Sequence, residues 1–382
     1  MMPYPAVCPF PRGGAARERG MTLIELMVAL LIGLLLGLAM MRALVFGEAQ
    51  RRTTNATSAV DLSGAYAASA LDTALRNAGS ALMQSVTPLD IGIVGCNPGF
   101  AAPLPTPFDQ FLGGDASRLR VAPLLIQANP SGATPASDVL AVMSGSGAAG
   151  GLPRSVVSVS GSTLTLNNAI GIGAPSIALM PLGGGVCSIL NISAVDAGAA
   201  QLTLSAAPAT TPATLLPLGN PAVGDVQFQL LGVNPATAAL TSYDLLTNTA
   251  RPMAGNVLAM QALYGVADNT GKLAQWVAPT TATGYDIDTL MASPAKLTPI
   301  VAVRVALILK GSLYEKEAVS AGKSLSWFSP VAGASTDLAG IPFSGLSAAA
   351  QTWTPAANSA DEHYRYGVVE FVVPVRNGMI VN

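Results

Sequence analysis

The chain has 382 residues, of which 51% are hydrophobic and only 10% are charged, with 19 basic and 21 acidic side chains. Soluble domains usually carry about 25% charged residues, so this sequence is unusually apolar. Its net charge of −2 excludes the basic surface that nucleic-acid binding requires, and no nucleic-acid partner is predicted. The high apolar content excludes wholesale disorder.

The first expected element is an apolar helix. Residues 26–41 read LMVALLIGLLLGLAMM, and the 21 residues from Met21 carry a single charge, on Glu25. A helix rises about 1.5 Å per residue, so this segment spans roughly 31 Å, the thickness of a bilayer hydrocarbon core. Residues 21–41 are therefore predicted to cross a membrane. Three arginines against one glutamate precede the segment, which predicts a cytoplasmic N-terminus and a periplasmic remainder.

The charge on Glu25 distinguishes between the possible roles of this segment, a plain membrane anchor or a secretory signal peptide. A carboxylate within a membrane span costs about 2.5 to 3.5 kcal/mol, which a plain single-pass anchor leaves unexplained. A secretory signal peptide would have a shorter uncharged apolar run and a small-residue cleavage site. Thr22 and Glu25 also fit a capping box, in which the carboxylate reaches back to free amide groups. The Glu25 carboxylate can cap the helix and still pair its charge with a cation elsewhere.

The residues from Arg19 to Ala29, RGMTLIELMVA, resemble the N-terminal signal of type IV prepilins and type II secretion pseudopilins. The resemblance implies that residues 1–20 are a leader, cut by prepilin peptidase between Gly20 and Met21, and that Met21 is then N-methylated. Glu25 becomes the fifth residue of the mature chain. In a filament its carboxylate would neutralise the N-terminal amine of a neighbouring subunit, a pairing much stronger in low dielectric than in water.

The helix is predicted to run over residues 21–85, because no proline occurs from residue 15 to residue 87. Gly33 and Gly37 form a GxxxG pair that lets two helices approach closely. Ordinary glycine frequency in membrane helices is the alternative explanation. Farther along, Gly64 could mark a bend. Four residues at helical spacing are expected to face a globular head: Leu71, Leu75, Ala78 and Leu82.

Residues 86–382 are predicted to form a β-rich periplasmic or extracellular head. Residues 156–160 and 163–166 form a predicted hairpin, as do residues 189–195 and 201–205. Residues 97–115 are interpreted as a surface loop, and the Pro-rich residues 206–221 as a loop between two sets of strands. The head is expected to divide, if at all, near residues 206–225. The fold class is α+β, with the long helix packed on a mainly antiparallel sheet.

Three later segments are similar to the PilW family of minor pilins: Asn256–Val266, Ile300–Leu309, and the stretch from Tyr364 through Pro374-Val-Arg-Asn377. The resemblance implies a structural subunit that works with other minor pilins to prime pilus assembly at the pilus tip. The turn after Val266 begins at Asp268 and lacks the alternating oxygens of a calcium loop, so no metal is inferred there.

No catalytic residue, cofactor or metal site is predicted. The single histidine, His363, lacks nearby ligands and is interpreted as a surface residue. Asp286 and Asp288 alternate as they would on one face of a strand, and without a third carboxylate we favour a structural role.

Cleavage would remove Cys8 and leave Cys96 and Cys187. In an oxidising periplasm this pair is a disulfide candidate that closes a loop of about 90 residues. Two buried free thiols are the alternative.

The sequence thus predicts a non-enzymatic minor pilin, held in the inner membrane before assembly and extracellular in the pilus afterwards. The implied partners are prepilin peptidase, the major and other minor pilins, and the inner-membrane assembly platform. The alternatives are a pseudopilin of a type II secretion machine and a membrane-tethered adhesin or periplasmic enzyme with a borrowed prepilin signal.

Overall fold

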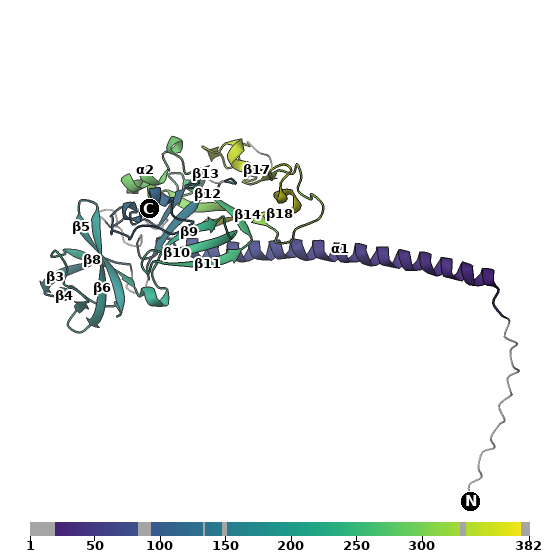
Figure 1. Ribbon diagram of the computed structural model, residues 1–382. Helices are drawn as coiled ribbons and strands as arrows, with labels where there is room; N and C mark the ends of the chain where they lie inside the picture. The colour runs from purple at the N-terminus through teal and green to yellow at the C-terminus, as the bar shows by residue number, and fades with distance from the viewer. Residues whose placement is uncertain (1–19, 83–92, 133, 147–150, 329–333, 376–382) are drawn as a thin grey trace, which may run out of the picture. The chain divides into compact units, whose positions relative to one another are not determined.

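A computed structural model of the protein describes residues 20–82, 93–132, 134–146, 151–328 and 334–375 (Figure 1). Most of the expected leader, residues 1–19, and the first part of the expected head, residues 86–92, lie outside the described residues. The chain divides into two compact units, residues 1–55 and residues 56–382. Each is considered by itself.

Helix α1, Leu23–Arg76, crosses from the first unit into the second. It ends earlier than the predicted residue 85. Gly79 and Ala81 have positive φ angles of 76° and 58°, and Gly79 N donates a hydrogen bond to Met143 O at 2.8 Å. The chain therefore leaves the helix to bond with a strand of the head. The expected helix face is buried: Leu71, Leu75, Ala78 and Leu82 are all at most 1% exposed.

Gly64 does not interrupt α1, which is continuous through it. A Cβ atom there would lie 2.5 Å from Leu309 Cδ1 and 2.8 Å from Val369 Cγ2. The missing side chain lets the helix backbone approach the sheet closely. One residue away, Ser63 Oγ accepts a hydrogen bond from Asn256 Nδ2 at 3.3 Å.

The head of the second unit contains two five-stranded sheets. The first has the order β1-β2-β9-β10-β11 and the second the order β16-β13-β12-β14-β18. All neighbouring strands are antiparallel except β13 and β16, which confirms the predicted α+β class. The first sheet comprises β1 Leu124–Gln127, β2 Val139–Ser144, β9 Gln227–Asn234, β10 Ala239–Asp244 and β11 Thr249–Gly255. The second comprises β12 Val257–Ala267, β13 Leu273–Val277, β14 Ile300–Lys310, β16 Phe343–Ser344 and β18 Tyr366–Pro374.

Residues 97–115 are not a surface loop. The segment contributes five residues to the main core, each at most 5% exposed: Phe100, Leu104, Phe108, Phe111 and Leu112. Phe100 packs edge-on against Phe228 of β9. The prolines and glycines here leave only the short turn η1, Phe111–Gly114, but they do not prevent the large apolar side chains between them from being buried.

Residues 154–219 form a closed barrel with the strand order β3-β4-β7-β6-β5-β8. Its strands are β3 Arg154–Ser160, β4 Thr163–Leu166, β5 Ser176–Gly183, β6 Val186–Asp196, β7 Gln201–Leu204 and β8 Thr214–Gly219. Both predicted hairpins are confirmed, as β3–β4 and β6–β7. The prediction of a loop over residues 206–221 is wrong, because β8 closes the barrel there. The apolar run Leu215-Leu216-Pro217-Leu218 outweighs the surrounding prolines and alanines.

The barrel is inserted between two neighbouring strands of the first sheet. Ser144 at the end of β2 pairs with Gln227 at the start of β9, so residues 145–226 occupy the place of a hairpin turn. The barrel has a core of its own, which includes Leu164, Ile192 and Leu202. A division of the head near residues 206–225 stays a prediction; β8 lies within that range.

Short elements cover the second sheet and connect its strands. The second helix, α2, spans Ile287–Ala292, and two-residue strands lie at β15 Leu325–Ser326 and β17 Thr352–Trp353. The 3₁₀ turns are η1 Phe111–Gly114, η2 Ala116–Arg118, η4 Pro221–Val223, η5 Thr281–Thr283, η6 Pro294–Leu297, η7 Ala348–Gln351 and η8 Ala360–His363. Trp327 and Phe328 are each 1% exposed and pack on the face formed by Ala259, Ala306 and Ile308.

Candidate functional site

The start of α1 carries the residues expected for processing and assembly. Gly20, Met21 and Thr22 precede the first helical residue, Leu23. All three are exposed, and a Cβ atom on Gly20 would meet no atom within 4 Å. Within the described residues, a glycine at this position therefore has no packing role.

Thr22 acts as the N-cap of α1. Its Oγ1 accepts a hydrogen bond from Glu25 N at 3.3 Å, and its carbonyl oxygen accepts one from Leu26 N at 3.1 Å. This contact is the threonine half of the predicted capping box. Within residues 20–55 as the structure describes them, the Glu25 carboxylate makes no hydrogen bond or ion pair. It can therefore accept a cation from another molecule.

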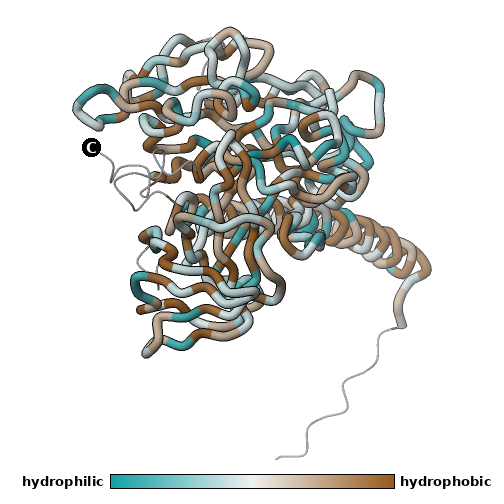
Figure 2. The backbone as a smooth tube through the Cα atoms, turned by 90° about the vertical axis from the view of Figure 1, so that its left-hand side faces the viewer, coloured by the Kyte–Doolittle hydropathy of each residue, from teal (hydrophilic) through white to brown (hydrophobic). Residues whose placement is uncertain are grey.

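The first part of α1 consists almost entirely of apolar residues (Figure 2), and its large apolar side chains are exposed. The helix is long and apolar enough to cross a membrane, with a mean hydropathy of 2.6 over an 18-residue window in which no residue is buried. A Cβ atom on Gly33 or Gly37 would meet nothing within 4 Å. Their proposed role in helix packing stays a prediction.

The three C-terminal segments singled out in the sequence lie side by side. They form β12, β14 and β18, which are neighbours in the second sheet. β14 pairs with β12 along one edge and with β18 along the other. These strands thus form one continuous surface, although 98 residues separate the end of the first from the start of the last.

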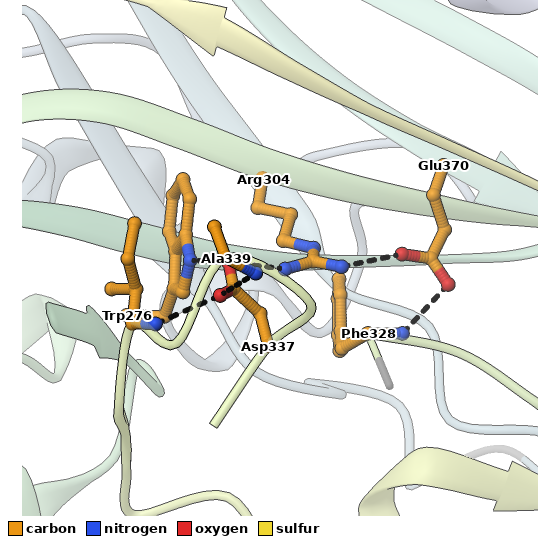
Figure 3. A network of polar contacts seen from close by, with 7 residues as sticks. Trp276, Arg304, Phe328, Asp337, Ala339 and Glu370 are labelled. Atoms are coloured by element: carbon orange, nitrogen blue, oxygen red, sulfur yellow. Dashed lines mark hydrogen bonds and ion pairs between the residues drawn. The ribbon is translucent and has the colours of Figure 1, made fainter. Parts of the chain in front are cut away.

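Arg304, near the middle of β14, joins this sheet to the segment that covers it (Figure 3). Its Nη1 lies 3.1 Å from Asp337 Oδ2 and its Nη2 lies 3.0 Å from Glu370 Oε2. The two carboxylates also receive hydrogen bonds from Trp276 Nε1 and Phe328 N. The guanidinium lies 5.7–5.8 Å from the ring centroids of Trp276, Phe328 and Phe343. The pattern IVAVRVALIL signals a cation in a buried strand, but not which distant carboxylates meet it.

Asp138 is a buried carboxyl that the sequence analysis did not single out. Oδ2 accepts a hydrogen bond from Ala262 N at 2.8 Å and Oδ1 accepts one from Asn129 N at 3.0 Å. Asp138 N donates to Met260 O at 2.7 Å. The residue thus links β2 of the first sheet to β12 of the second. Burial raises the pKa of its carboxyl to about 7, although both backbone hydrogen bonds act to lower it.

Cys96 and Cys187 form a disulfide with a Cα–Cα distance of 5.6 Å. The bond ties the segment before η1 to strand β6 of the barrel. Asn97 N donates to Gly185 O at 2.8 Å, and Arg120 Nη1 donates to both Gly95 O and Gly185 O. The disulfide and these hydrogen bonds hold the β5–β6 hairpin against the main core.

Two interpretations of single residues change. Asp286 and Asp288 do not lie on a strand, because they start α2: Asp286 Oδ2 accepts a hydrogen bond from Thr289 N at 3.1 Å, and Asp288 pairs with Arg118 at 3.0 Å. His363 is partly buried and stacks on Tyr314 at 4.7 Å. Among the described residues, no group of three His, Cys, Asp or Glu side chains is placed to hold a metal ion.

Two family models match the chain. The prokaryotic N-terminal methylation motif matches residues 15–41, and the type IV pilus-assembly protein W family, PilW, matches residues 239–377. The second range contains β12, β14 and β18. By these two matches the chain is PilW-like: it joins a prepilin-type N-terminus to a PilW region. The resemblance read from the sequence is therefore confirmed at both ends of the chain.

The barrel of this PilW-like chain and its disulfide lie outside both matched ranges. A type IV-like pilin from Thermus thermophilus is similar to the structure at 12% identity, over 53% of this chain and 84% of that chain, with a TM-score of 0.23. That similarity is too low to carry an argument, and the assignment rests on the two family matches. No curated protein matches the chain.

Proposed function

We propose that this PilW-like chain is a structural minor pilin that primes type IV pilus assembly, at or near the pilus tip. Prepilin peptidase cuts between Gly20 and Met21, and Met21 is then N-methylated. Before assembly the chain lies in the inner membrane, with residues 21–41 as a single span and the head in the periplasm. Its role is non-enzymatic.

The observation that carries this proposal is that the Glu25 carboxylate has apolar, exposed surroundings and no partner in the described part of its unit. Cleavage after Gly20 would create a cationic amine four residues away. Between two subunits, such a pair in a low-dielectric filament core is strongly favourable compared with an unpaired charge.

The test replaces Glu25 by alanine in the full chain. We expect normal processing and a normal head, but pilus assembly that is reduced about tenfold or more, because the N-terminal amine of a neighbour loses its partner. Glu48→Ala is the matched control. Glu48 lies on the same helix and makes an exposed ion pair with Arg52, which contributes little.

Pili counted by electron microscopy and twitching motility give the readout. Wild-type pilus numbers in Glu25→Ala would contradict the proposal. Loss of protein secretion with intact pili would instead assign the chain to a type II secretion pseudopilus.

A further inference from the structure

The edge strand of the second sheet, β18, has a free hydrogen-bonding side. Val375 N donates to Val301 O, and Arg365 O accepts from Gly311 N. Because strand residues alternate, these bonds direct the odd-numbered residues of β18 toward β14. The peptide groups of Tyr366, Val368, Glu370 and Val372 therefore face outward. Within the described residues, these outward groups make no backbone hydrogen bond.

The other edges in the described part of the head are protected. β11 has Pro252 at its centre and Arg251 beside it, and proline cannot donate to an incoming strand. β1 is only four residues long and packs against α2. β16 has two residues, and the barrel is closed.

β18 is longer than these edges and has no proline before its last position, Pro374; the two-residue strand β15 contacts it but pairs with β17 and not with β18. The single charge of β18 is on Glu370. That carboxylate is already held by Arg304 and by Phe328 N. Val372 is 47% exposed. A long apolar edge of this kind is a template for another strand.

A cavity of about 230 Å³ lies at the amino end of this edge. Tyr366 and Gly367 line one side, and Val60 and Asp61 of α1 line the other. Lys323 also lines it, and neither Lys323 nor Asp61 makes an ion pair within the described residues. In strand addition, main-chain bonds provide affinity and such side-chain pockets provide selectivity.

We propose that the outer edge of β18 pairs with an extended segment of a different, neighbouring pilin subunit. Only an extended backbone offers alternating donors and acceptors at the spacing of the four outward residues. One side chain of that segment would enter the cavity between β18 and α1. The inference rests on the proposed pilus function, and it names the contact through which this head meets a neighbour.

The experiment compares Val372→Pro with Val372→Thr in the full chain, in intact cells. Proline removes the outward N–H without removing a bond to β14, whereas threonine keeps both the N–H and the branched shape. A photo-crosslinking residue replaces Lys323 in both chains. A chain with the crosslinker at Val157, an exposed barrel residue, is the positional control. Formation of the Cys96–Cys187 disulfide reports folding.

We expect a crosslink from position 323 to another pilin-type subunit, identified by mass spectrometry from its own prepilin-type N-terminus. The crosslink should persist in Val372→Thr and fall about fivefold or more in Val372→Pro, since one interchain hydrogen bond is lost and the proline ring blocks the edge. The Val157 position should give no such product. Val368→Pro removes a second outward N–H and should act in the same way, which guards against misfolding of one variant.

Equal crosslinking in the proline and threonine variants would overturn the proposal, as would a crosslink only to a second copy of this chain or to a protein without a pilin N-terminus. The two proposals fail separately. If Glu25→Ala blocks assembly but both proline variants crosslink like Val372→Thr, only the strand-pairing proposal fails. Normal assembly in Glu25→Ala defeats the proposed function itself.

Discussion

At the scale of single residues, glycine has different structural roles in different parts of α1. A Cβ atom on Gly33 or Gly37 would meet no side chain among the described residues, whereas one on Gly64 would lie within 3 Å of Leu309 of β14 and Val369 of β18. From the sequence, all three are merely glycines in a helix. The distinction depends on Leu309 and Val369, which lie more than 200 residues away.

Gly64→Ala tests this close approach. Alanine improves helix propensity by about 1 kcal/mol, but its Cβ would overlap Leu309 and Val369. We expect a net destabilisation of about 1 to 3 kcal/mol, because overpacking outweighs propensity. Thermal unfolding of the detergent-solubilised chain measures it. A higher melting temperature would mean that helix propensity outweighs overpacking and that the sheet leaves room for a Cβ atom at position 64.

Asp138 predicts how stability depends on pH. Its folded pKa of about 7 lies above its unfolded value of 3.8, so between these values the folded state binds more protons. Its contribution is complete below about pH 4 and is lost as the pH rises to about 7, by up to about 4 kcal/mol. Hydrogen bonds from Ser117 and Thr270 lower the pKa values of the Asp115 and Asp268 carboxyls. The contributions of these two residues to stability are therefore lost as the pH falls below the usual range of an aspartate.

Urea unfolding of the solubilised chain at intervals from pH 4 to pH 7 provides the measurement. The midpoint should fall with rising pH in the wild-type chain, and the slope should flatten in Asp138→Asn, which cannot ionise. If the midpoint depended on pH equally in both chains, a group other than Asp138 would be responsible for the pH dependence.

At the scale of elements, strands were predictable where the apolar run is long. β12, β14 and β18 coincide with the three segments singled out in the sequence, and each is an apolar run of nine or more residues rich in valine, leucine or alanine. β8 was missed because prolines and alanines surround its short apolar run. The buried segment 97–115 was misjudged because the prolines and glycines around its buried phenylalanine and leucine side chains are typical of an exposed loop.

The disulfide is the covalent link between the barrel and the main core. We expect the variant with both Cys96→Ser and Cys187→Ser to unfold about 2 to 5 kcal/mol more easily, since the bond closes a long loop in the unfolded chain. Reductant should destabilise the wild-type head by a similar amount and leave the double variant unchanged. Denaturant unfolding with and without reductant measures both. Equal stability of all four samples would show that packing alone fixes the hairpin.

At the scale of the whole molecule, the apolar composition has two separate origins. Part of it belongs to the exposed surface of α1 and part to the cores of the two sheets and the barrel. The signal around Gly20, Met21 and Glu25 was readable because it is local in the sequence. The insertion of the barrel between β2 and β9 was not readable, because it depends on pairing between residues 144 and 227.

The central claim is that this PilW-like chain is processed as a prepilin and then assembled. The most direct test is N-terminal sequencing, together with the intact mass, of the protein purified from membranes. The account predicts a chain that begins at Met21 with a methylated amine. A chain that keeps residues 1–20, or that begins downstream of Glu25, would contradict it.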